Sequence, residues 1–184
     1  MKILIFGASG SGTTTLGKAL AERLGYMHVD ADDYYWKKTV PPFQEKIALS
    51  ERNARLTSDF LSAANMIVSG SMVSWGDYWK TAFDLAIFLY LPQEIRMERL
   101  KKREAERYGD LLLTDQATIE NSKAFLAWAK KYDDEGFDGR SLKIHRNWIK
   151  ALKCPVLSLD GDLTLPERIQ KVMTKMKKLA DKPA

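Results

Sequence analysis

Cysteine and long apolar runs are what this chain of 184 residues lacks. Its one cysteine, Cys154, cannot form a disulfide within the chain, which excludes a small disulfide-stapled scaffold. No stretch reaches the roughly 18 uninterrupted apolar residues that a membrane-spanning helix needs. The apolar residues at the start of the chain are too few for a signal peptide. We therefore expect a cytoplasmic protein with no membrane partner.

The net charge of +5 is concentrated near the end of the chain. Residues 167–184 contain six lysines and arginines, against the acidic residues Glu167 and Asp181. Apolar residues recur at helical spacing through the same segment, which predicts an amphipathic helix with its basic face in water. A nucleic-acid partner is therefore not expected, although a role of this helix on nucleic acid is a third, weaker interpretation.

Short apolar runs alternate with helical patterns along the whole chain. This alternation predicts an α/β fold of a single domain over residues 1–184, with a five-stranded parallel sheet and helices on both faces. The expected strands are 2–6, 26–33, 66–70, 84–91 and 155–159. The expected helices are 12–24, 44–64, 93–108, 115–131, 141–152 and 165–179. The region of about 93–140 exceeds a minimal α/β domain and is expected to be a helical insert.

The first expected strand runs into the sequence GASGSGTTT, residues 7–15. Gly7, Gly12 and Thr14 occupy the glycine and hydroxyl positions of the phosphate-binding loop pattern G-x-x-x-x-G-K-[ST]. The backbone N–H groups of such a loop bind phosphate, and the hydroxyl binds Mg²⁺. We therefore expect a P-loop NTPase fold that uses ATP, or another nucleoside triphosphate, and Mg²⁺. The expected nucleotide-binding residues are Gly7, Ser9, Gly10, Ser11, Gly12, Thr13, Thr14 and Thr15.

The lysine of this pattern is absent, because Thr13 stands in its place. A threonine hydroxyl offers the β- and γ-phosphates a hydrogen bond but no charge. Either another cation replaces the lysine, or the site binds nucleotide and catalyses poorly. Lys18 is a poor replacement, since five residues of helix rotate it about 140° away from position 13.

The loop GASGSGTTT resembles that of bacterial phosphoribulokinases, in which threonine can stand at the lysine position of an active kinase. The layout of the whole chain resembles the nucleoside- and nucleotide-kinase branch of P-loop proteins. This group includes adenylate, cytidylate and shikimate kinases, with uridine kinase as a near neighbour. The resemblance implies an ATP- and Mg²⁺-dependent phosphotransferase with a helical lid. Its acceptor would be a nucleoside, a nucleotide or a similar small metabolite.

An acidic stretch, VDADDYYW, follows the second expected strand at residues 29–36. It resembles both the D-x-D pair of shikimate-kinase-like enzymes and the D-x-F-Y segment of uridine kinases, and both comparisons select Asp32. A carboxylate there can orient an attacking hydroxyl and accept its proton. We expect Asp32 to be catalytic and to lie with Thr14 near the metal. Asp30 and Asp33 are expected to contact substrate, or to reach Mg²⁺ through water.

Aromatic residues gather behind two of the expected strands. Tyr34 and Trp36 follow the second strand, and Trp75 follows the third. Ligands of open α/β sheets bind at this edge, where aromatic faces can stack on a planar acceptor. Packing beneath the loops is an equally good interpretation of these rings. Ser71 resembles the small residues that let an acceptor approach the edge of the sheet.

Four arginines recur at spacings of three, four and four along the expected helix 93–108: Arg96, Arg99, Arg103 and Arg107. Like charges at such spacing repel each other, so the stripe favours a function, with a charged helix face in water as the alternative. The resemblance implies a lid whose arginines neutralise the transferring phosphoryl group and replace the missing lysine. We expect Arg99 and Arg103 to be catalytic, and Arg107 and Arg140 to bind substrate.

A second class of function stays open. In it, Thr13 marks lost chemistry, and the chain is a non-catalytic nucleotide-binding protein that serves as a sensor or regulatory switch. Binding of nucleotide without phosphoryl transfer to any acceptor would favour this alternative. The sequence names neither the acceptor nor the oligomeric state, for which a monomer and a homodimer are both compatible.

Overall fold

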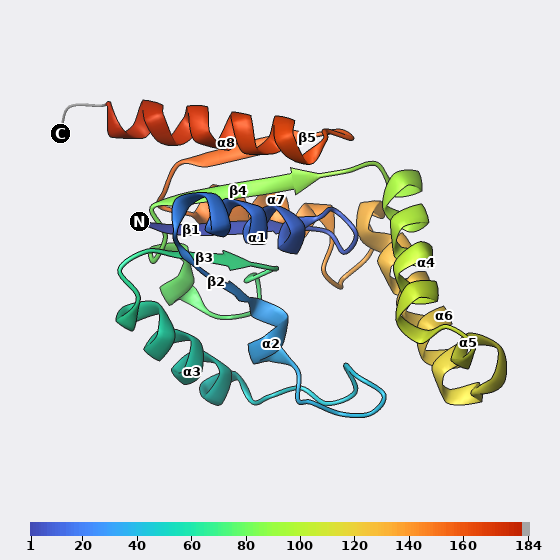
Figure 1. Cartoon of the computed structure of the whole chain (residues 1–184). Helices are drawn as coiled ribbons and strands as arrows, with labels where there is room; N and C mark the ends of the chain where they lie inside the picture. The colour runs from blue at the N-terminus through green and yellow to red at the C-terminus, as the bar shows by residue number, and fades with distance from the viewer. Residues whose placement is uncertain (182–184) are drawn as a thin grey trace.

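The computed structural model describes residues 1–181, and within them it confirms the five-stranded parallel sheet (Figure 1). The strands lie in the order β2-β3-β1-β4-β5, and each neighbouring pair is parallel. Their carboxyl ends therefore meet at one edge, where the loops after β1, β2 and β3 come together. The strands are β1 (Lys2–Gly7), β2 (Met27–Asp30), β3 (Met66–Ser69), β4 (Leu85–Tyr90) and β5 (Val156–Asp160).

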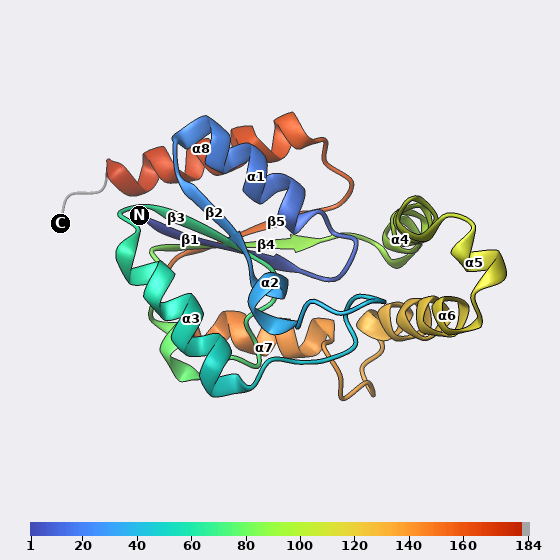
Figure 2. The ribbon, with the colours of Figure 1, turned by 60° about the horizontal axis from the view of Figure 1, so that its bottom comes forward.

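The helices that cover the sheet form two pairs, one on each face (Figure 2). α1 and α8 cover one face, and α3 and α7 cover the other, as the alternating pattern predicts. Among residues 1–181, no helix has the length and apolar character that crossing a membrane requires. The covering helices are α1 (Thr13–Leu24), α3 (Leu49–Ser62), α7 (Leu142–Ala151) and α8 (Leu165–Ala180).

The two faces of the sheet have separate apolar cores. Successive residues of a strand point to opposite faces, so the apolar run of β1 serves both cores. Ile3 and Ile5 pack under α1 and α8, whereas Leu4 and Phe6 pack under α3 and α7. All four side chains are fully buried. The phosphate-binding loop therefore starts from a buried strand at the centre of the sheet.

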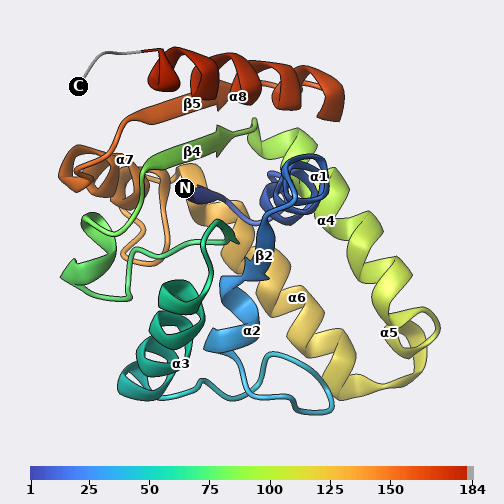
Figure 3. The ribbon, with the colours of Figure 1, turned by 60° about the vertical axis from the view of Figure 1, so that its left-hand side comes forward.

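Three helices of the expected insert extend beyond the carboxyl edge of the sheet (Figure 3). Their base is fastened by Arg96, which is fully buried and pairs with Asp133 at 2.5 Å. Arg96 Nε also donates to the carbonyl of Leu91 at 3.0 Å. Arg96 therefore does not share the role expected for the other arginines of the stripe, because the end of the insert packs over it. The elements are α4 (Gln93–Tyr108), α5 (Leu111–Thr114), α6 (Gln116–Lys130) and the 3₁₀ turn η2 (Lys131–Asp133).

Two expected elements differ in the structure. The second strand ends at Asp30, whose carboxylate accepts the Asp32 N–H at 3.0 Å and so caps a short helix, α2 (Ala31–Tyr35). The helix expected from residue 44 begins at Leu49. Before it, residues 36–47 fold back on themselves, and Ile47 N–H donates to the Tyr35 carbonyl at 2.8 Å. This pairing buries Ile47 without a helix.

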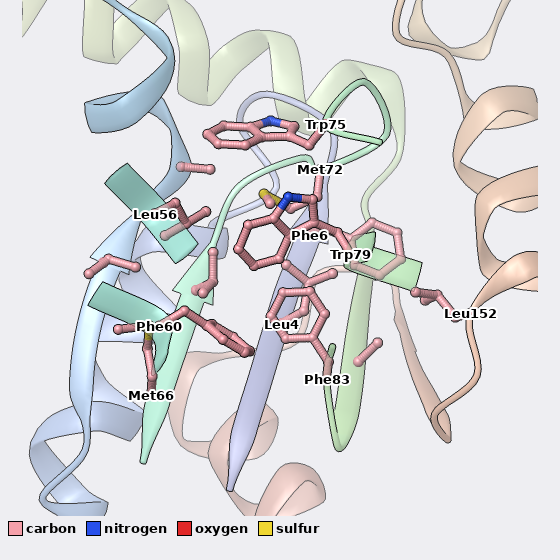
Figure 4. Close-up of a cluster of buried hydrophobic side chains, with 14 of the residues drawn as sticks. Leu4, Phe6, Leu56, Phe60, Met66, Met72, Trp75, Trp79, Phe83 and Leu152 are labelled. Atoms are coloured by element: carbon pink, nitrogen blue, oxygen red, sulfur yellow. The ribbon is translucent and has the colours of Figure 1, made fainter. Parts of the chain in front are cut away.

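Tryptophans of the chain after β3 fill the core under α3 (Figure 4). Trp75 and Trp79 are each 1% exposed. Trp79 lies in the 3₁₀ turn η1 (Asp77–Lys80). Trp79 Nε1 donates to Asn53 Oδ1 at 2.8 Å. Of the two interpretations of Trp75, contact with the acceptor is therefore wrong, because its side chain is buried in the core between the sheet and the covering helices.

The basic helix near the end of the chain is α8, as its apolar spacing predicts. A capping box between Thr164 and Glu167 starts it, and Val172 is fully buried against the sheet. One of its basic residues departs from the expected solvated face, because Arg168 is only 5% exposed. Lys182 of the basic segment lies outside the described residues.

Candidate active site

A cleft of about 1710 Å³ lies at the carboxyl edge of the sheet, between the loops after β1 to β3 and the helices of the insert. It brings most of the expected site residues together. Two of them lie elsewhere: Ser11 is fully buried behind the glycine loop, and Trp75 is in the core. The expected residues that line the cleft are Gly7, Ser9, Gly10, Gly12, Thr13, Thr14, Thr15, Asp30, Asp32, Asp33, Tyr34, Trp36, Ser71, Arg99, Arg103, Arg107 and Arg140.

The glycine loop has the geometry of an anion site. Gly10 and Gly12 have φ angles of 84° and 92°, in the left-handed region that favours glycine. Gly12 is also the N-cap of α1 and supplies no side-chain cap, so the first N–H groups of the helix stay open to a ligand. These groups and the helix dipole favour phosphate.

The Thr14 hydroxyl donates a hydrogen bond to Asp30 Oδ2 at 2.6 Å. Ser69 Oγ donates to the same carboxylate oxygen at 3.3 Å. Asp30, rather than Asp32, is thus the carboxylate in contact with Thr14. The pair fits Mg²⁺, which prefers hard oxygen donors and takes only one or two protein groups when it arrives with phosphate. Residues 1–181 contain no group of three or more His, Cys, Asp or Glu that could hold a metal ion.

Asp32 opens into the cleft, and the cleft walls surround it. Although the side chain is exposed to the cleft, the surrounding walls partly desolvate the Asp32 carboxyl and raise its pKa above the usual range, against the opposing effect of the Arg140 guanidinium. Asp30 raises the same pKa further, and Arg103 lowers it. Asp32 therefore lies between the acidic end of β2 and the arginines of the insert. A carboxylate with a raised pKa in such a place is suited to receive a proton.

Arg99 connects the insert to the far side of the glycine loop. Its Nη2 pairs with Asp162 Oδ1 at 2.5 Å, in the chain between β5 and α8, and both side chains are partly exposed. Its Nη1 lies 3.9 Å from where a Cβ on Gly12 would stand. Arg99 is thus placed beside the loop rather than beside the acidic end of β2.

The other arginines of the insert lie over aromatic rings along the cleft. Arg103 and Arg140 both approach Asp32 closely enough to lower its pKa. Arg107 reaches across to the segment before α3. In order, the rings under Arg103, Arg140 and Arg107 are Phe125 at 5.7 Å, Trp128 at 5.7 Å and Phe43 at 4.9 Å.

The sequence analysis did not find Arg55 and Asp59, which line the cleft from α3. The Tyr34 hydroxyl donates to Asp59 Oδ2 at 2.5 Å, and Arg55 lies 5.7 Å from the Tyr34 ring. Burial and this hydrogen bond raise the pKa of Tyr34. The available signal was their spacing of four on a helix whose apolar stripe faces the core.

A buried histidine, also absent from the sequence predictions, supports Ser71. His145 is fully buried, and its Nε2 lies 2.8 Å from Ser71 Oγ. Its Nδ1 lies 2.7 Å from the hydroxyl of Tyr132, at the end of the insert. Burial lowers the pKa of His145 to about 3, so the ring is neutral and has one donor and one acceptor nitrogen. The chain of three side chains links the base of the insert to the edge of the cleft.

Basic side chains outnumber acidic ones in the cleft, eight against five. Such an excess favours ligands with several negative charges. The basic residues are Lys18, Lys38, Lys46, Arg55, Arg99, Arg103, Arg107 and Arg140, and the acidic ones are Asp30, Asp32, Asp33, Asp59 and Glu104.

Comparison with known proteins is consistent with this geometry. Residues 3–124 match the AAA domain family. The uncharacterized protein YqaC of Bacillus subtilis (strain 168) is 44% identical over 171 residues, which are 93% of this chain and 94% of that protein. Cytidylate kinase of Archaeoglobus fulgidus is 32% identical over 129 residues, 64% of this chain and 68% of that protein.

Solved structures share the fold at low sequence identity. Shikimate kinase from Acinetobacter baumannii, in complex with shikimate, has a TM-score of 0.62 at 18% identity and covers 98% of this chain and 95% of its own. Deoxyadenosine kinase from M. mycoides has a TM-score of 0.51 at 16% identity, with coverages of 97% and 100%. The chain belongs to the AAA domain family of P-loop proteins and, within it, is a small-molecule kinase related to the nucleotide kinases.

Proposed function

We propose that the protein transfers the γ-phosphoryl group of ATP, with Mg²⁺, to a small acceptor that carries a negative charge. The observation that carries this proposal is the arrangement of Asp32 between the glycine loop and the arginines Arg103 and Arg140 in one cationic cleft. Because several relatives are cytidylate kinases, nucleoside monophosphates are the first acceptors to test.

In this proposal the glycine loop binds the triphosphate, and Thr14 and Asp30 hold Mg²⁺. The metal ion, when bound, neutralises charge on the phosphates. Arg55 and Arg140 hold the negative group of the acceptor, beside Tyr34 and Trp36. Asp32 orients the attacking oxygen, and Arg103 stabilises charge on the group in transfer. The insert acts as a lid that excludes water.

A panel of acceptors tests the proposal through release of ADP from ATP and Mg²⁺. One arm holds CMP, dCMP, UMP, AMP and GMP, and the other holds hydroxyl acceptors: shikimate, gluconate and deoxyadenosine. We expect turnover with a member of the first arm. Turnover only in the second arm would support phosphoryl transfer but would contradict the proposal that the acceptor is a nucleotide.

The second candidate function is nucleotide binding without catalysis, which Thr13 at the lysine position favours. ATP binding by calorimetry without phosphoryl transfer in either arm would support it. Absence of ATP binding would contradict both candidates, since both depend on the glycine loop.

A further inference from the structure

Arg168 of α8 differs from the other arginines that are buried in residues 1–181. Arg96, which is fully buried, pairs with a carboxylate, and Arg52, which is 6% exposed, lies between two aromatic rings. Arg168 is 5% exposed, and no carboxylate of the described residues lies within 4.0 Å of it. A buried cation with no carboxylate in contact is costly, and Asp162 raises the pKa of Arg168 only from beyond contact distance, so this position requires another explanation.

Among residues 1–181, the single hydrogen-bond partner of the Arg168 guanidinium is the back of the glycine loop. Nη1 donates to the Ser11 carbonyl at 2.7 Å, across 157 residues of sequence, and Nε has no partner. The same Nη1 lies 3.0 Å from where a Cβ on Gly12 would stand. The residue before Thr13 is therefore in contact with a fixed positive charge, although Thr13 itself brings none.

The hydrogen bond from Arg168 to the Ser11 carbonyl affects the phosphate-facing side of the loop through the peptide unit between Ser11 and Gly12. The Ser11 carbonyl and the Gly12 N–H belong to the same planar trans peptide, so they point in opposite directions. With the carbonyl held at the back by Arg168, the N–H faces the hollow side of the loop. A cation on the carbonyl also polarises the peptide and strengthens the N–H as a donor.

We propose that Arg168 is a positioning residue of the phosphate-binding loop, and that it compensates from behind the loop for the lysine that Thr13 replaces. The inference rests on the proposed function, because it requires phosphate in the loop. The position of Arg168 behind the loop distinguishes it from the arginines of the insert and from Lys18. Those side chains line the open cleft, whereas Arg168 is held in place by the packing of α8 against the sheet.

The first experiment measures binding to Arg168→Gln, which keeps a hydrogen-bond donor but removes the charge. Calorimetry with Mg²⁺ and either ATP or inorganic tripolyphosphate should show a Kd increase of about 10- to 100-fold for both ligands. Loss for tripolyphosphate assigns the effect to the phosphates, since this probe has no base. Arg52→Gln is the matched control, because Arg52 is also buried and also donates to a backbone carbonyl, that of Ser74. An unchanged Kd in Arg168→Gln, or an equal loss in Arg52→Gln, would overturn the proposal.

The second experiment is a rescue. If Arg168 compensates for the missing lysine, Thr13→Lys should recover ATP and tripolyphosphate affinity when it is added to Arg168→Gln. A double variant that binds no better than Arg168→Gln would show that Arg168 only supports the fold, and the proposal would fail.

If Arg168→Gln does not fold, the affinity of the single variant Thr13→Lys for ATP and tripolyphosphate still tests the proposal. With Arg168 present, the added lysine meets a site that already has cations on both sides, so affinity should not improve. A gain of about tenfold or more would overturn the proposal. Failure of the proposed function is separately visible. A wild-type protein that binds ATP without transferring phosphate contradicts only the catalytic function, whereas one that binds neither probe contradicts both.

Discussion

The Thr14 hydroxyl and the Asp30 carboxylate, 2.6 Å apart, tie the glycine loop to the acidic end of β2. Thr14 lies in the first turn of α1, which follows β1, whereas Asp30 ends β2, and β3 lies between these two strands. Ser69, at the end of β3, completes the contact. This side of the cleft therefore has an oxygen-rich corner where phosphate and acceptor would meet.

Asp30→Asn should raise the Mg²⁺ concentration needed for half-maximal phosphoryl transfer. The amide keeps the size of the side chain but removes the charge that would attract the metal and order Thr14. We expect an increase of about 10- to 100-fold. A Mg²⁺ titration at saturating ATP measures it, and Asp33→Asn, which also changes a carboxylate of the cleft, tests whether Asp33 reaches the metal instead. An unchanged requirement in Asp30→Asn would contradict the assignment of Thr14 and Asp30 to the metal.

Arg103→Ala should lower kcat far more than it weakens ATP binding. Its guanidinium reaches toward Asp32 from α4, where charge on the transferring group would develop. Loss of such a contact costs about 100-fold or more in rate. The control is Lys102→Ala, since Lys102 is on the same helix with its side chain 79% exposed. If Arg103→Ala, and also Arg99→Ala and Arg107→Ala, transferred phosphate at the wild-type rate, the lid role would be wrong.

The buried His145 predicts a loss of stability at acidic pH. Its folded-state pKa of about 3 lies below the ordinary value of 6.5, so the unfolded chain binds the proton more readily between these values. Stability is complete above pH 6.5 and falls as the pH drops toward 3, by up to about 1.4 kcal/mol per pH unit.

Urea unfolding at a series of pH values measures this dependence. His145→Gln should be less stable than wild type at pH 8 and should have a smaller decrease between pH 6.5 and 4. His28 also has a lowered pKa, so part of the decrease should remain. Parallel curves for wild type and His145→Gln would rule out His145 as the source.

Local patterns were sufficient to predict the sheet, the glycine loop and most helices. A run of apolar residues followed by Gly7 and Gly12 is interpretable without knowledge of the rest of the chain, because strand and loop chemistry are local. Asp32 was selected by resemblance to two kinase motifs, and it lines the cleft two residues after the end of β2. The pattern could not predict that Asp30 caps α2 and contacts Thr14, which depends on the order of strands in the sheet.

The spacing of the arginines could not predict which of them are buried and which line the cleft. Arg96 and Arg103 belong to one stripe, but the end of the insert covers Arg96, while Arg103 stays in the cleft. Arg168 was counted on a solvated face, and only the packing of α8 beside the loop buries it. Trp75 shows the same limit, because an aromatic residue after a strand is equally suited to a core or a ligand. Long-range packing decides each case.

Asp32→Asn should abolish most transfer without affecting the fold. The substitution keeps the size of the side chain but removes its charge and basicity. For a hydroxyl acceptor, transfer should fall by roughly 10²- to 10⁴-fold, the usual worth of a positioned general base. For a monophosphate acceptor, whose attacking oxygen has no proton to give up, lost orientation should cost about 100-fold. Because phosphoryl transition states need little base assistance, orientation of the acceptor accounts for part of this loss. ATP affinity should persist, since the glycine loop carries most of it.

The raised pKa of Asp32 predicts the direction in which Asp32→Asn changes the stability of the protein. A carboxyl whose pKa is raised by folding is less favourably charged in the folded cleft than in the unfolded chain, so it does not stabilise the protein at neutral pH. Asp32→Asn should therefore have a Tm equal to or above that of wild type, measured at pH 7.5 beside the kinetics. Asp33→Asn, also exposed, is the matched control. Unfolding of Asp32→Asn, or unchanged transfer in it while Asp33→Asn or Asp30→Asn is inactive, would assign the role to a neighbouring carboxylate.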